Sequence, residues 1–221
     1  MAQTPVIDVI SPVAQKCPSC PTTTLVQAYI DAARKFCAKT RWLKTTIPGA
    51  TIINTESYSL GSDTYNEILG IQAIDITETA TDVHGLTEKI SSDWNSTDAN
   101  DVPEFYQYIP EGQFALHPKP IDVYTLAVSV VLQPKRGANT VDDSLLIKWG
   151  YALEDGALAY LLNLKDMPWY DPNQANEKLL LFRGAQNRAT NSAAGGYNAG
   201  SLATNIIGPR AAAVRTKMLA I

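Results

Sequence analysis

The hydrophobic period of this chain changes twice, and that change constrains the fold more than any other feature of the sequence. Residues 24–41 carry an apolar stripe with the spacing of a helix. Residues 42–134 are rich in Thr, Ile, Val and Tyr, and helical spacing returns after residue 142. Side chains on one face recur every 3.6 residues in a helix and every second residue in a strand. The pattern therefore predicts a helix, a β-rich insertion and then further helices, which is an α+β fold.

The first predicted helix begins at Thr24, because Thr24-Leu25-Val26-Gln27 has the form of a capping box. It ends near Arg41. The residues expected to face the core are Leu25, Ala28, Tyr29, Ala32, Ala33, Phe36 and Cys37. Residues 1–23 contain four prolines and little periodicity, so we expect an extended N-terminal arm there.

Two further helices are predicted after the β-rich region. The second begins with Asp142 or Asp143 as its cap, and the segment 166–170 breaks it. Asp171-Pro172-Asn173-Gln174 is a strong start for the third, with Asp as the cap and Pro at the first position. That helix ends near Asn191. We expect the first helix to pack against these two as a bundle that carries the β insertion.

The β-rich insertion spans residues 42–137 and contains turn signals such as Pro48-Gly49 and Pro110-Glu111-Gly112. Residues 82–101 are polar and predict a loop with a short helix near residues 86–94. The expected strands are 43–47, 51–54, 67–77, 104–109, 114–116 and 124–133. Short strands at this spacing predict a sandwich or an open barrel.

Charge divides the chain into two parts. The whole sequence has 18 basic and 22 acidic side chains, a net charge of −4. The first 177 residues hold 12 basic and 22 acidic groups, a net charge of −10, and the six basic groups behind them have no acidic counterpart. Residues 192–221 form a small-residue tail, so the bundle comprises 24–41 with 138–191 and the tail is a second extended arm. A basic tail on an acidic body indicates one of two things: docking on an acidic surface, which another copy of the chain could supply, or a tail that is simply solvated.

Composition excludes several classes of partner. A net negative charge with sparse basic residues argues against sequence-specific binding of DNA. No apolar run approaches the roughly 18 residues that cross a bilayer, so we expect no membrane association. The N-terminus has no basic stretch before an apolar core, so we expect no signal peptide.

Residues that could carry chemistry are few. Cys17-Pro18-Ser19-Cys20 has the spacing of half a zinc site or of a redox pair. A structural zinc site needs four ligands, and Cys37 adds only one more thiol, so structural thiols are the favoured interpretation. No nucleophile motif accompanies His84 or His117. We therefore expect no enzyme activity, no catalytic residues, no cofactor and no metal.

Several motifs occur in an order and at a spacing that point to a family. They are Cys20-Pro21, the segments 33–37, 116–120, 132–134, 156–162 and 168–172, and the single residues Trp42 and Phe182. From about residue 17 to 190, this order resembles the head-to-tail adaptor proteins of tailed bacteriophages. These are also called connector, neck or head-completion proteins, chiefly of short-tailed phages. The resemblance implies an α-helical bundle that carries a β insertion.

The resemblance also implies a structural role in the virion, with assembly in the host cytoplasm. About twelve copies would form a ring between the portal protein and the tail nozzle or tail fibre proteins. Genomic DNA would pass through the ring without sequence-specific binding. The C-terminal tail would grip the portal, and the candidate contact residues are Ile206, Ile207, Arg210, Arg215 and Lys217. The candidates for contacts between subunits are Trp149, Tyr160, Trp169 and Tyr170.

The aromatic segment 167–170 keeps two interpretations, because it either seals the end of the helical core or seats a neighbouring subunit. Two alternatives to the adaptor function also remain at this point. One is another ring of the virion, such as a tail terminator or a nozzle component. The other is a small zinc-binding module that uses Cys17, Cys20 and Cys37.

Overall fold

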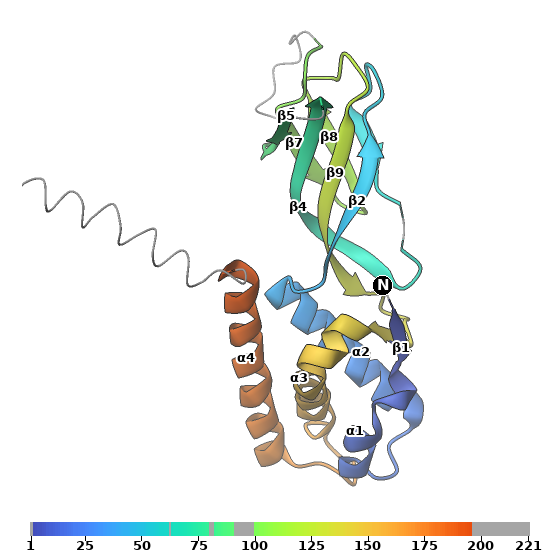
Figure 1. The fold of residues 1–221 in the computed structure, drawn as a ribbon. Coiled ribbons are helices and arrows are strands. Elements are labelled where there is room, and N and C mark those ends of the chain that lie inside the picture. The colour runs from blue at the N-terminus through green and yellow to red at the C-terminus, as the bar shows by residue number, and fades with distance from the viewer. Residues whose placement is uncertain (1, 62, 80–81, 91–99, 196–221) are drawn as a thin grey trace, which may run out of the picture.

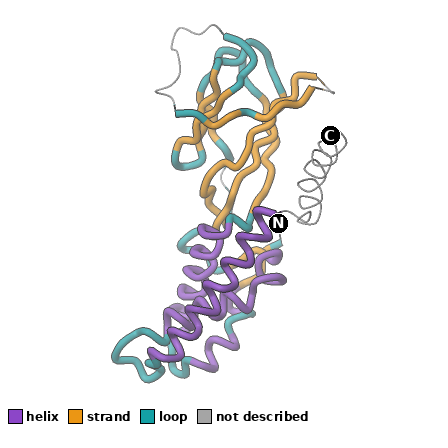
Figure 2. The backbone as a smooth tube through the Cα atoms, turned by 90° about the vertical axis from the view of Figure 1, so that its left-hand side faces the viewer, coloured by secondary structure: helices purple, strands orange, loops and turns teal. Residues whose placement is uncertain are grey.

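The computed structural model describes residues 2–61, 63–79, 82–90 and 100–195. Helices gather at one end of the molecule and sheets at the other, so the fold is mixed α+β, as predicted (Figures 1 and 2). The described α-helices are α1 (Ser11–Lys16), α2 (Thr22–Thr40), α3 (Asp143–Leu161) and α4 (Pro172–Gly195). α2, α3 and α4 pack against one another in pairs.

Local sequence explains where α3 and α4 begin. The Asp142 carboxylate accepts a hydrogen bond from the Ser144 amide at 2.9 Å, which caps α3 as predicted. The Asp171 carboxylate accepts from the amides of Asn173 and Gln174 at 3.1 and 3.0 Å and caps α4 in the same way. α4 continues past the predicted end at Asn191 to Gly195.

The predicted start of the first long helix is wrong by half a turn. α2 begins at Thr22, and no side chain caps it. The Pro21 carbonyl accepts from the amides of both Thr24 and Leu25, so Thr24 already lies inside the first turn. The capping box therefore does not form, because proline at the cap position starts the helix two residues earlier.

The N-terminal segment is folded rather than extended, which corrects the predicted arm. It forms β1 (Gln3–Pro5), a 3-10 turn (Val6–Asp8) and α1. β1 pairs antiparallel with β10 (Thr140–Asp142), which ties the N-terminus to the start of α3. The residues that bury this segment against the helices are Val6, Ile10, Val13 and Cys17. Their spacing is helical, and the prolines between them obscured it.

The β-rich region forms two sheets. One has the order β2-β9-β4-β5 and the other the order β3-β8-β7-β6. Neither described sheet closes into a barrel. The strands of the first are β2 (Lys44–Ala50), β9 (Thr125–Pro134), β4 (Asn66–Thr79) and β5 (Asp82–Gly85). Those of the second are β3 (Ser57–Ser59), β8 (Gln113–His117), β7 (Phe105–Ile109) and β6 (Thr87–Glu88).

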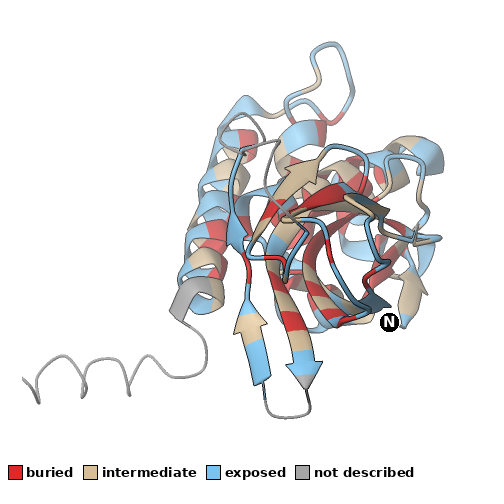
Figure 3. Cartoon of the chain, turned by 90° about the horizontal axis from the view of Figure 1, so that it is seen from above, coloured by how far each residue is buried: buried red, intermediate tan, exposed pale blue. Residues whose placement is uncertain are grey.

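Burial along β9 follows the predicted alternation at the end far from the helices. Leu126, Val128 and Val130 are buried, and Thr125, the first residue of the strand, is exposed. Near the helices both faces of the strand are covered, because α2 packs against β9 there. Figure 3 shows these buried bands along the strands.

Two predicted elements differ. Residues 51–54 form a turn rather than a strand. Residues 82–88 contribute β5 and β6 rather than a loop, because the Leu86 amide donates to the Ile74 carbonyl at 2.8 Å and Leu86 is buried. Residues 86–90 are not helical, and the rest of the predicted short helix lies outside the described residues.

Candidate interaction surfaces

One arginine links the helices to two strands of the first sheet. Arg34 of α2 donates to the Pro134 carbonyl at 2.6 Å and forms an ion pair with Glu67 of β4 at 2.8 Å. Gln133 also donates to the Glu67 carboxylate, at 2.5 Å. Burial alone raises the pKa of Glu67, but these bonds and the charges of Arg34 and Lys135 lower it overall. The junction is therefore a fixed connection, which determines how the sheets project from the helices.

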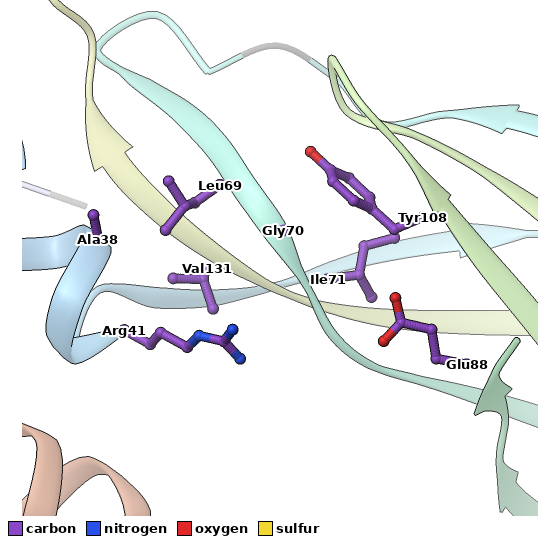
Figure 4. Close-up of a pocket in the computed structure, with 8 residues that line it drawn as sticks. All are labelled: Ala38, Arg41, Leu69, Gly70, Ile71, Glu88, Tyr108 and Val131. Atoms are coloured by element: carbon purple, nitrogen blue, oxygen red, sulfur yellow. The ribbon is translucent and has the colours of Figure 1, made fainter. Parts of the chain in front are cut away.

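A cleft of about 270 Å³ opens beside this junction (Figure 4). Leu69, Ile71 and Val131 form an aliphatic wall, and Arg41 and Glu88 supply one cation and one anion. Arg41 lies at the C-cap of α2 in the left-handed conformation, with φ 51°, which turns the chain from the helix into β2. The cleft offers complementary charges beside an apolar surface, and such a surface suits contact with another protein chain.

The cysteines and histidines form no metal-binding group among the described residues. Cys17 and Cys37 are buried, and Cys20 is half-buried. Burial raises the pKa of Cys17 to about 11 and that of Cys37 to about 12, so both remain protonated thiols at neutral pH. His84 pairs with Glu78 at 3.5 Å. Within the described ranges, no group of three or more His, Cys, Asp or Glu side chains is arranged to hold a metal ion.

Two of the four aromatic residues predicted at subunit contacts are used by the chain itself. Trp149 is buried between Trp42 and Phe36, with ring centroids 5.5 and 5.4 Å away. Trp169 is buried, and its indole N–H donates to the Leu161 carbonyl at 3.1 Å, which seals the end of α3. This contact fits the interpretation that the aromatic segment closes the helical core.

The other two aromatic candidates are available to a partner. Tyr160 and Tyr170 are 49% and 41% exposed. Tyr160 borders a shallow groove along α2 that Thr24, Gln27 and Asp31 also line. The predicted portal-contact residues Ile206, Ile207, Arg210, Arg215 and Lys217 lie outside the described residues.

Sequence reasoning missed an exposed aliphatic cluster at the far end of the sheets. Ile52 and Ile53 follow β2, and Ile121 and Val123 precede β9. Their exposed fractions are 61%, 47%, 49% and 60% in that order. We call these four residues the tip patch. The signal in the sequence was aliphatic residues beside the turns at Pro48-Gly49 and Pro118-Lys119-Pro120; Ile52 and Ile53 were interpreted as part of a strand over 51–54, and Ile121 and Val123 were assigned to no element.

No helix in the described part of the chain is long and apolar enough to span a bilayer.

A search of curated proteins found no match to the chain. A scan against family models matched the chain to the SU10 adaptor protein family over residues 5–205. This match includes the helices, the two four-stranded sheets and the N-terminal segment from Pro5 onwards. The chain therefore belongs to the SU10 adaptor protein family, and it is a structural adaptor protein of a bacteriophage virion.

Proposed function

We propose that this protein is a head-to-tail adaptor that forms a ring of about twelve copies between the portal and the tail nozzle. The ring extends the channel through which DNA leaves the head. The observation that carries the proposal is the family match over residues 5–205.

The charge of the body supports a role beside moving DNA. The first 177 residues carry 12 basic and 22 acidic side chains. A channel wall that lacks clustered cations does not retain phosphates, because phosphate binding depends on Lys and Arg contacts. DNA therefore passes without sequence-specific binding.

The segment after α4 docks on the portal. Residues 196–221 contain three basic and no acidic side chains, together with Ile206 and Ile207. Such a segment suits an acidic surface with apolar pockets. Each contact is weak, but a ring engages many tails at once, and multivalency makes the attachment strong. Tyr160 and Tyr170 contribute to contacts between neighbouring subunits.

The test is removal of residues 196–221, which leaves α4 intact because that helix ends at Gly195. The native mass of full-length and truncated chains is measured alone and after mixing with the purified portal ring of the same phage. We expect only the full-length chain to add to the portal. The control is Arg183→Gln with Arg188→Gln, which removes exposed charge from α4 and should preserve attachment. Full attachment by the truncated chain would contradict tail docking, and no attachment by any chain would contradict the adaptor function.

A further inference from the structure

The four aliphatic side chains of the tip patch are exposed and lie together at one end of the molecule. Its four side chains come from two loops, residues 51–56 and 118–124, at the end of the sheets farthest from the helices (Figure 1). Figure 3 looks down on this end of the molecule. Single exposed aliphatic residues are ordinary on protein surfaces, but a cluster of them marks an interaction site.

Hydrogen bonds hold the two loops together. The Thr51 amide donates to the Tyr124 carbonyl at 2.9 Å, and the Tyr124 amide donates to the Thr51 hydroxyl at 2.7 Å. The same hydroxyl donates to the Asp122 carbonyl at 2.9 Å. The Asn54 amide donates to the Pro120 carbonyl at 2.9 Å. The patch is therefore presented on paired loops rather than on two independent ones.

Hydrogen bonds from the Tyr58 side chain stabilise the loop that carries Ile52 and Ile53. Its hydroxyl accepts from the Ile52 amide at 3.1 Å and lies within hydrogen-bond distance of the Thr55 carbonyl at 2.9 Å. Its ring stacks on Phe114 of β8, with centroids 5.3 Å apart. A surface fixed in this way loses little conformational entropy when it binds, so its apolar area contributes efficiently to affinity.

The surroundings of the tip patch are acidic. Asp101 and Asp122 are exposed, and among the described residues neither forms an ion pair with a cation. Their carboxylates use one oxygen each to accept from the amides of Val102 and Val123, at 2.8 and 2.7 Å. Lys119 is offset by Glu56 at 3.5 Å. The charge of the rim is therefore negative.

We propose that the tip patch is the docking surface for a tail-side virion protein whose binding site is an apolar pocket bordered by Lys or Arg. The negative rim selects a positively charged border, and it disfavours contact between two tips, because like charges would then face each other. The position of the patch points to the tail side. The proposed portal-binding segment follows α4, and α4 ends beside the base of the sheets (Figure 1). The patch lies at the opposite end of the sheets, away from the start of that segment. The inference rests on the proposed adaptor function.

The experiment uses phage that lacks this gene, complemented with variants of the full chain. The test variant is Ile52→Thr with Val123→Thr, because threonine keeps the β-branch and both side chains are about 60% exposed. The control is Ile147→Thr, at an aliphatic residue on α3 that is 87% exposed and so even more accessible than the two test residues. Particles are separated by sedimentation, and adaptor and tail proteins on them are quantified by mass spectrometry.

We expect the test variant to be present on heads at the wild-type level while tailed particles fall by about tenfold or more, as for loss of an interface hot spot. Ile147→Thr should give normal tailed particles. Wild-type numbers of tailed particles with the test variant would overturn the proposal. Heads that lack the test variant would also overturn it, because the patch would then serve the head side. Absence of the wild-type chain from heads would instead contradict the adaptor function itself.

A second variant tests the rim. Asp101→Asn with Asp122→Asn removes two charges but keeps an oxygen to accept from the amides of Val102 and Val123. Heads with wild-type adaptor should join tail proteins less well as salt is raised, since exposed charge pairs are screened. Heads with the Asn variant should join less well at low salt and depend less on salt. An unchanged salt dependence would contradict the basic border of the partner.

Discussion

One glycine sets how closely the three long helices approach. A Cβ atom built on Gly156 of α3 would lie 2.8 Å from Cε2 of Phe182 and 3.0 Å from Cβ of Ala32. Phe182 belongs to α4 and Ala32 to α2, and both are buried. Glycine inside a helix costs about 1 kcal/mol relative to alanine. Glycine is needed here despite that cost, because the Phe182 ring occupies the space that a side chain at position 156 would fill.

We predict that Gly156→Ala lowers the free energy of unfolding by up to about 2 kcal/mol. Overpacking a core costs about 1–3 kcal/mol, and the gain in helix propensity of about 1 kcal/mol offsets only part of that cost. Denaturant titration followed by circular dichroism measures the change. The control is Gly150→Ala in the same helix, where a Cβ atom meets nothing within 4 Å. It should stabilise by up to about 1 kcal/mol. A stabilising Gly156→Ala would contradict the tight crossing.

The predictions that succeeded at the scale of elements depended on local signals. Asp142 and Asp171 cap the helices that follow them, and each cap lies within three residues of the amides that it satisfies. Non-local pairing was missed. β1 pairs with β10 across more than 130 residues of sequence, and nothing in Gln3-Thr4-Pro5 alone announces that partner. Ile52 and Ile53 of the tip patch were predicted as strand for a related reason. β-branched residues favour strands wherever they occur, whereas the turn at this place depends on hydrogen bonds to Pro120 and Tyr124, which are distant in sequence.

The same dependence on distant partners applies at the junction. Arg34 is a helix residue whose contacts, the Glu67 carboxylate and the Pro134 carbonyl, belong to two strands. A planar guanidinium can satisfy both at once, and an ammonium group on a flexible stem cannot do so as well. The helical end and the sheets are therefore coupled by a side chain that no periodicity argument identifies.

We predict that Arg34→Met weakens this coupling and reduces the dependence of stability on acid. The pKa of Glu67 is lowered in the folded protein, so its contribution to stability is present above the ordinary value of 4.5 and is lost as pH falls below it. The wild type should therefore lose stability between about pH 5 and 3 more steeply than Arg34→Met. At pH 7 the variant should be less stable by about 1–2 kcal/mol, the lower part of the range for a hydrogen bond to a charged group, because the Glu67 side chain is 40% exposed and solvent screens the pair. Equal pH slopes in urea titrations would contradict this role of the bridge.

In the whole molecule, the buried core of the described residues and the basic tail occupy different segments of the chain. The buried cluster of the described residues ends at Ala189, and the last described helix ends at Gly195. The three basic residues beyond that point, Arg210, Arg215 and Lys217, have no acidic neighbours in the tail. Folding of the described core and the proposed attachment through the tail therefore involve different segments, and experiments can separate the two.

We predict that a chain ending at residue 195 keeps the melting temperature of the full chain, although its net charge changes from −4 to −7 with the loss of three basic residues. A chain ending at residue 181 should lose cooperative unfolding, because it lacks buried Phe182, Ala185 and Ala189. Truncating one buried phenylalanine to alanine costs about 3–5 kcal/mol, a large part of a typical stability of about 5–15 kcal/mol. Differential scanning calorimetry of the three chains measures both effects. A markedly lower melting temperature for the 195-residue chain would mean that the tail stabilises the fold, and portal binding by that chain would then have to be compared at equal stability.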